Sequence, residues 1–304
     1  MKGEKEHIMS TKVKQLIADM ESTNIFMKKE MTFIEYTENL HDFQGMITKM
    51  VMGEDYEEGM RLDEAIFRLE AKSRAKGLVT DQIVRKGLAA LRTVKRELAI
   101  TMAGKKGDNL VARTLQYVER PDAKMYQNLY VTDGENETEI DTVVLTASGI
   151  IILEIKNTKD DITITPEGRI FHSGVQCYDK KTIDEKMENK RKLLKERLQA
   201  MALERGFQIP IIVESFIVFS CPKGVRVHVE DRFRREKWCF RTGLVTKIDD
   251  YVGKASYSKE QLSQLEEMFN AMESQVKRFT LIVNFDDVRA DVAHMLVHMD
   301  ELYG

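Results

Sequence analysis

A chain of 304 residues is long enough for one large domain or two ordinary ones, and 42% hydrophobic with 32% charged residues is typical of a globular protein with a highly charged surface. The formal net charge of −3 excludes a general electrostatic attraction to nucleic acid, so any such binding needs a local basic patch. The three cysteines, Cys177, Cys221 and Cys239, have no CxxC spacing, which argues against a disulfide framework or a zinc knuckle.

The sequence shows no signal for a membrane. No apolar run approaches membrane-spanning length, and the first six residues lack the apolar stretch of a signal peptide. Together with the unpaired cysteine pattern, this predicts a cytoplasmic protein.

Residues 1–103 are predicted to form an α-helical N-terminal region, since no proline occurs there and the apolar spacing is helical. Helices are expected over about 11–42, where Thr23-Asn24 could break the helix, over 61–76 and over 80–102, with Thr80 as the N-cap of the third. The apolar stripe of the third helix comprises Ile83, Val84, Leu88, Leu91, Val94 and Leu98. This region either packs on the rest of the chain or forms its own bundle. Its mixed Lys/Glu surface is a solvated face or a site for a partner protein or a second copy.

The middle of the chain, residues 104–251, alternates between helix and strand patterns. A helix beginning at Gly107–Asp108 has Leu110, Val111, Leu115 and Val118 on one stripe. A second helix is expected over 184–205. Strands are expected over 128–131, 140–145, 150–156, 162–165, 169–171, 209–213, 216–219, 225–229 and 238–240. C-terminal helices in 252–304, with a capping box at Ser258, are expected to pack on this core.

The two strands at 140–145 and 150–156 are joined by a short turn, Thr146-Ala-Ser-Gly149. If Leu145 pairs with Ile150, the register places Asp141 directly opposite Glu154. Lys156 lies two positions beyond Glu154 and therefore on the same face. Two carboxylates and an ammonium group are thus predicted to meet at one end of the hairpin.

The hairpin is otherwise apolar on both faces, as expected for strands that are covered on each side. Charged groups in such strands are costly unless they pair with each other or bind a metal. A structural Lys–carboxylate ion pair is one interpretation. One Lys does not neutralise two carboxylates, however, and a close carboxylate pair favours a divalent cation.

Asp141 followed by Glu154-Ile-Lys156 resembles the D…(D/E)xK core of the PD-(D/E)xK nuclease superfamily, and more narrowly the nuclease-related domain family, NERD. The resemblance also includes the segments 107–115, 139–144, 149–157, 188–194 and 217–220, and it extends from about Gly104 to Tyr251. It implies an α/β fold with a mixed central sheet flanked by helices, an all-α N-terminal region and C-terminal helices.

The resemblance implies a metal-dependent nuclease, for which DNA is favoured over RNA as the substrate while both stay open. Asp141, Glu154 and the backbone carbonyl of Ile155 would bind Mg²⁺ or Mn²⁺, and Lys156 would assist attack by water. Asp108 stands where the family usually has Glu; it is either a third metal ligand or a first-turn acid that the helix dipole favours.

The predicted helix over 184–205 carries a basic surface. Lys190, Arg191 and Lys195 are candidates for nucleic-acid contacts, because phosphates are bound largely by Lys and Arg. The alternative is a solvated helix whose charge is balanced by acidic residues such as Glu188, which takes the place of a Gln common in the family.

Two other functions compete with the nuclease. The chain is alternatively a nucleic-acid-binding or assembly subunit with a nuclease-like core that is silent without a partner. His294 and His298 have the spacing of two zinc ligands on a helix, but the base Glu of a metalloprotease is absent, which favours a packing role. Phage defence is a hypothesis from the general character of the family.

Overall fold

The computed structural model describes residues 11–22, 30–176, 181–230, 237–273, 279–280 and 283–301. The chain divides into two compact units. One, called the helical unit, contains the described residues up to Met102 and those after Arg278. The other, called the sheet unit, comprises Ala103–Lys277. Cys177 lies outside the described residues, and Cys221 and Cys239 are free.

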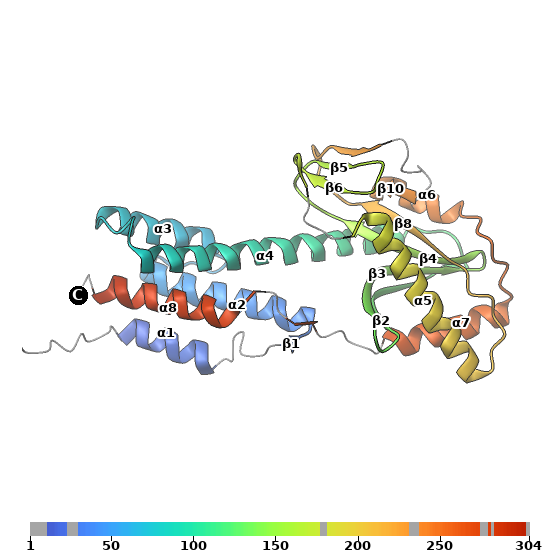
Figure 1. Ribbon diagram of the computed structural model, residues 1–304, viewed down its shortest axis with the longest axis horizontal. Helices are drawn as coiled ribbons and strands as arrows, with labels where there is room; N and C mark the ends of the chain where they lie inside the picture. Colours follow the sequence, from blue (N-terminus) through green and yellow to red (C-terminus); the bar gives the residue numbers. More distant parts are fainter. Residues whose placement is uncertain are drawn as a thin grey trace, which may run out of the picture. The chain divides into compact units, whose positions relative to one another are not determined.

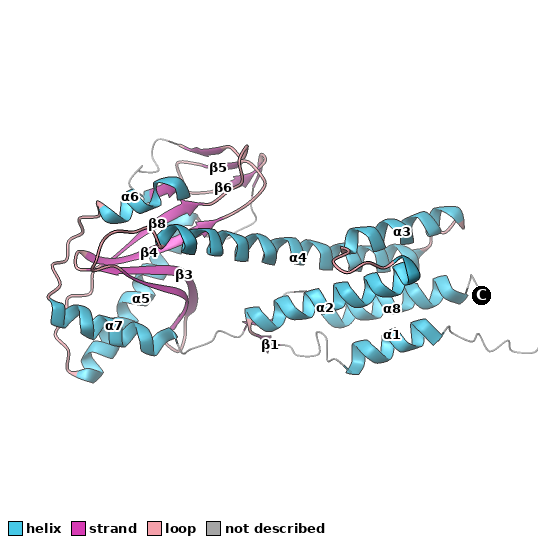
Figure 2. Cartoon of the chain, turned by 180° about the vertical axis from the view of Figure 1, so that it is seen from behind, coloured by secondary structure: helices cyan, strands magenta, loops and turns pink. Residues whose placement is uncertain are grey.

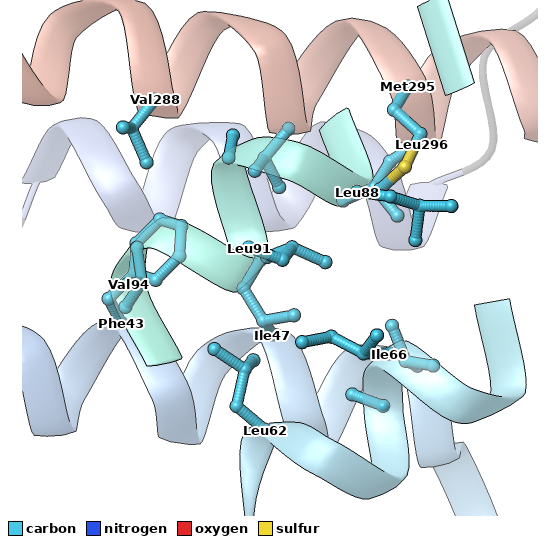
Figure 3. Close-up of a cluster of buried hydrophobic side chains, with 14 of the residues drawn as sticks. Phe43, Ile47, Leu62, Ile66, Leu88, Leu91, Val94, Val288, Met295 and Leu296 are labelled. Carbon is cyan, nitrogen blue, oxygen red and sulfur yellow. The ribbon is translucent and has the colours of Figure 1, made fainter. Parts of the chain in front are cut away.

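The helical unit is built from four helices and part of a fifth, with one small two-stranded sheet. The elements are α1 (Thr11–Ser22), β1 (Glu30–Met31), α2 (Phe33–Met52), η1 (Gly53–Asp55), α3 (Leu62–Ala75), the first part of α4 (Gln82–Leu115), β11 (Phe279–Thr280) and α8 (Phe285–Glu301). Apolar side chains at helical spacing form one core, in which Phe43, Ile47, Leu91 and Val94 are fully buried (Figure 3).

Side chains define where these helices begin. Thr32 and Glu35 form a capping box at the start of α2. The predicted cap of α4 was one residue off: the Asp81 carboxylate, and not Thr80, accepts the N–H groups of Ile83 and Val84.

Helix α4 continues through the position where the sequence predicts a second helix to begin. Gly107 lies inside it, and a Cβ added there would come within 2.7 Å of the Asn157 Cβ. The glycine therefore marks a close approach between the helix and the chain after β4, and not a helix start.

The sheet unit contains a mixed five-stranded sheet in the order β10-β8-β4-β3-β2 (Figure 1). Its strands are β2 (Lys124–Thr132), β3 (Glu137–Thr146), β4 (Gly149–Lys156), β8 (Val213–Phe219) and β10 (Trp238–Phe240). β3 is antiparallel to both of its neighbours, whereas β8 is parallel to β4 and β10. The predicted strand over 209–213 does not form; Pro210, which lacks an N–H donor, falls in that segment.

A second sheet of four short strands has the order β7-β6-β5-β9. These strands are β5 (Ile162–Ile164), β6 (Ile170–His172), β7 (Val175–Gln176) and β9 (Val227–Val229). The predictions for β5, β6 and β9 agree with the structure to within a few residues, whereas β7 was not predicted.

Helices cover both faces of the five-stranded sheet (Figure 2). α5 (Ile183–Arg205) and α7 (Lys259–Glu273) contribute to the apolar cluster on one face. The end of α4, through Val111 and Leu115, and α6 (Leu244–Asp249) contribute to the cluster on the other. The mixed α/β class predicted from sequence is confirmed.

The division of the chain differs from the expected boundaries at its C-terminal end. α7 packs in the sheet unit as expected, and the capping box formed by Ser258 and Gln261 is present. α8, however, belongs to the core of the helical unit, where Gly87 allows Met295 to lie directly against the α4 backbone. The described helices include none that is long and apolar enough to cross a membrane.

Candidate active site

The β3–β4 hairpin has the register that the sequence predicts. Leu145 pairs with Ile150, and the pairing continues to Thr142 and Leu153. Gly149 in the turn adopts a φ of 148°, which favours glycine. Extended by one residue beyond the last paired residues, this register places Asp141 beside Glu154, so a turn about four residues away determines which two carboxylates come close.

The ladder between β2 and β3 is interrupted at Asp141. Gln127 pairs with Thr142 and Leu129 pairs with Ile140, but the intervening pair is missing, and Asn128 has a φ of 51°. Ile140 and Val143 both reach the same apolar cluster although they are three residues apart. The alternation of β3 therefore changes at Asp141, as at other local distortions that redirect side chains near functional sites.

Asp141 uses its two carboxylate oxygens differently. Its Oδ2 accepts a hydrogen bond of 2.7 Å from the Ile155 backbone N–H, while Oδ1 lies 3.8 Å from the Nζ of Lys190. Burial, together with the nearby charge of Glu154, raises the pKa of Asp141 to about 7. Only its Oδ1 is directed toward a cationic group.

Glu154 is the one buried charged residue among those described, with 6% of its surface exposed. Its Oε1 lies 2.6 Å from the Lys156 Nζ and its Oε2 lies 2.5 Å from the Lys190 Nζ. Burial alone would raise the pKa of Glu154, but the two ammonium groups outweigh burial and lower it. The carboxylate therefore stays ionised because it is paired twice.

Lys190, which the sequence analysis assigned to a phosphate-contacting surface, lies instead inside this cluster. Only 14% of its side chain is exposed. Burial would lower the pKa of Lys190, but the carboxylates of Glu154 and Asp141 raise it above its ordinary value. Its position had a signal in the sequence: Lys190 falls between Met187 and Leu194 at spacings of three and four residues, on the buried stripe of α5.

Two further acids lie near the pair. Burial, followed by the charges of Glu139 and Glu154, raises the pKa of Asp108 to about 6. Asp108 is therefore close enough to the cluster to sense it, as the sequence suggested. The second acid, Glu139, is half-buried in β3, and its charge also acts on Lys190. The sequence signal for Glu139 was its spacing of two residues from Asp141, which is the period of a strand.

The other basic candidates on α5 lie away from the carboxylates. Arg191 forms an ion pair with Glu188, whose side chain is 62% exposed, so Glu188 faces solvent. Lys195 is exposed. In the helical unit, the Nε2 of His298 lies 3.0 Å from an Asp81 oxygen, which agrees with the predicted packing role.

The donor set fits a hard divalent cation. Asp141 Oδ1 and Glu154 Oε2 are directed toward one point, and Mg²⁺ in proteins is commonly held by one or two carboxylates and several waters. Across the described ranges, no group of three or more His, Cys, Asp and Glu side chains is arranged to hold a metal ion. A cation here would therefore take two carboxylates as its side-chain ligands and complete its shell with backbone or water oxygens.

A mixed sheet covered by helices, with a D…ExK set at the end of its central hairpin, defines a nuclease-like protein class. Residues 103–220 match the family model of the nuclease-related domain, NERD. This match confirms the predicted resemblance. Comparison of the chain with curated proteins and with solved structures gave no match.

Proposed function

We propose that this protein is a metal-dependent nuclease that hydrolyses phosphodiester bonds in DNA. The observation that carries the proposal is the convergence of Asp141 Oδ1 and Glu154 Oε2 on one point, beside the ammonium group of Lys156. The match to a nuclease-related domain supports the reaction class. DNA as substrate and Mg²⁺ or Mn²⁺ as metal rest on the family resemblance.

Asp141 and Glu154 would hold the cation, with the Ile155 carbonyl as a backbone ligand and Asp108 as a nearby acid that contacts it through water. A bound divalent cation neutralises charge on the phosphate and lowers the pKa of a bound water. The hydrogen bond from the Ile155 N–H fixes the Asp141 carboxylate, so that Oδ1 faces the cluster.

Lys156 would orient the attacking water and stabilise negative charge that develops on the phosphate. Its side chain is 30% exposed, more than that of Lys190, so it is accessible to a substrate. It lies 2.6 Å from Glu154, so its ammonium stays beside the carboxylate proposed to bind metal. Arg191 and Lys195, on an outer face of α5, would contact the nucleic-acid backbone.

The test is incubation of the purified full chain with DNA or RNA, in Mg²⁺, in Mn²⁺ and in EDTA. Cleavage of DNA that requires the metal and is lost in folded Asp141→Ala, Glu154→Ala and Lys156→Ala variants is expected. Undiminished cleavage by folded Glu154→Ala would refute the assignment. Metal binding without cleavage of any substrate would favour the alternative of a nuclease-like assembly or binding subunit.

A further inference from the structure

Lys190 lies at the point on which the two carboxylates converge. Its Nζ is 2.5 Å from Glu154 Oε2 and 3.8 Å from Asp141 Oδ1, and these two oxygens are the ones that a shared cation would take. Lys156 differs, because its Nζ has an ion pair with the other Glu154 oxygen, Oε1, and with no oxygen of Asp141 among the described contacts.

The charges of the four ion-paired groups balance. Two carboxylates, Asp141 and Glu154, face two ammonium groups, Lys156 and Lys190. A divalent cation gains little net attraction from such a neutral group, whereas the same carboxylates with one ammonium carry a net negative charge. The ammonium that shares both carboxylates is therefore the one whose presence most opposes a metal ion.

The fold keeps Lys190 in this position. A capping box formed by Thr182 and Glu185 fixes the start of α5, and the buried Met187 and Leu194 flank Lys190 on the helix stripe. The α5 backbone thus holds the Cα of Lys190 over the sheet, while its four-carbon stem leaves the ammonium free to change position.

We propose that Lys190 is an internal cation of the carboxylate pair, which must leave the position between Asp141 and Glu154 for a divalent cation to bind there. Lys190 thereby sets the metal concentration that the protein needs. This inference rests on the proposed function, because it takes Asp141 and Glu154 as the metal ligands.

The first experiment is calorimetric titration of the full chain with Mn²⁺ and Mg²⁺, without nucleic acid. Lys190→Met removes the charge and keeps an unbranched side chain, and it is expected to bind the metal at least about tenfold more tightly than the natural chain. Lys190→Arg keeps the charge and is expected to bind no more tightly than the natural chain. The matched control is Lys195→Met, which removes an exposed charge from the same helix and is expected to change affinity less than about twofold.

The second experiment uses the natural chain and does not depend on how the variants fold. Reductive methylation of lysines, read residue by residue by mass spectrometry, reports whether an ammonium group is accessible. Labelling of Lys190 is expected to rise when Mg²⁺ is added, and labelling of Lys195 is expected to stay constant. Lys190 labelling that does not change at saturating Mg²⁺ would overturn the inference.

The outcomes separate the inference from the function on which it rests. Equal metal affinity in the natural chain and folded Lys190→Met overturns the role of Lys190 and leaves the proposed metal site intact. Weaker binding by Lys190→Met also overturns it, since Lys190 would then organise the carboxylates rather than compete. Failure of both proteins to bind any metal, with undisturbed folds, overturns the metal site and the inference together.

Discussion

Two aspartates at opposite ends of the β3–β4 hairpin have pKa values shifted in opposite directions. Asp122, near the turn, accepts the Ala147 N–H at 2.6 Å and pairs with Arg120. Burial would raise the pKa of Asp122, but these two donors outweigh burial and lower it. Asp141, at the open end, has one backbone donor and a neighbouring carboxylate, and its pKa rises to about 7.

The opposite pKa shifts distinguish a carboxylate with a structural role, Asp122, from a candidate functional carboxylate, Asp141. At the turn, Arg120 also donates to the Tyr251 carbonyl and to the Ser148 hydroxyl, so charges and polar groups there are paired with one another. At the open end, the burial of Asp141 has a cost that its existing pairs only partly offset, and a group held in that way is a candidate for binding or catalysis. The predictions below test this contrast.

The largest expected effect is on cleavage. Asp141→Asn removes a proposed metal ligand and is expected to lower the rate of metal-dependent DNA cleavage by about a thousandfold, since a metal supplies several kcal/mol of transition-state stabilisation. Asp122→Asn, the same change at the other end of the hairpin, is expected to leave the rate within about threefold. Equal losses in both folded variants, measured on one substrate, would remove the distinction.

The next effect is on stability. Ile152 is fully buried two residues before Glu154, and Ile152→Ala is expected to lower the free energy of unfolding by about 2–5 kcal/mol because it leaves a cavity. Metal affinity of the folded protein is expected to stay unchanged. Val252→Ala is the control, since Val252 is 89% exposed and its loss should cost less than about 0.5 kcal/mol. Denaturant unfolding with and without Mg²⁺ measures both.

A smaller effect on stability is expected at Gly107, where α4 lies close to the chain after β4. Gly107→Ala forces a Cβ against Asn157 and is expected to destabilise the protein by about 1–3 kcal/mol. Gly104→Ala, three residues earlier in α4, meets nothing within 4 Å and is expected to stabilise by about 0.5–1 kcal/mol through helix propensity. Opposite signs in thermal or denaturant unfolding confirm the packing role; a gain in both variants contradicts it.

The smallest expected effect is the pH dependence of the stability that Asp122 contributes near the turn. A lowered pKa means that Asp122 contributes stability above the pKa of its unfolded state, 3.8, and that this contribution is lost as the pH falls through the lower folded value. Asp122→Asn is therefore expected to cost about 1 kcal/mol at neutral pH, and the difference from the natural chain is expected to vanish in acid. A difference that is independent of pH would show that the charge of Asp122 is not the cause.

The hairpin and its site were predictable because the relevant information is local. Side chains in a strand alternate with a period of two, so a turn at Thr146–Gly149 determines the partner of every residue on both strands. A slip by one residue would turn the apolar residues of β4 to the wrong face. The register, extended by one residue, brings Asp141 near Glu154, although the alternation of β3 changes at Asp141.

The helices were predicted less well where the signal is not local. Gly107 has the pattern of a helix start, but the contact that requires glycine comes from Asn157, fifty residues later. The helix over 285–301 has an apolar stripe that suits either core, and the space beside Gly87 on α4 decides in favour of the helical unit. An amphipathic pattern shows which face of a helix is buried, but it does not show which element packs against that face.

The sequence by itself determined the register of the β3–β4 hairpin, and with it the meeting of Asp141, Glu154 and Lys156 at the open end, because the turn sets the pairing of both strands. Only the tertiary structure decided that Lys190 joins them, since its approach depends on how α5 packs across the sheet. In the sequence, Lys190 is visible only as a charged residue that interrupts the apolar stripe of α5. The opposite charge that compensates it lies on another element, and packing alone brings the two together.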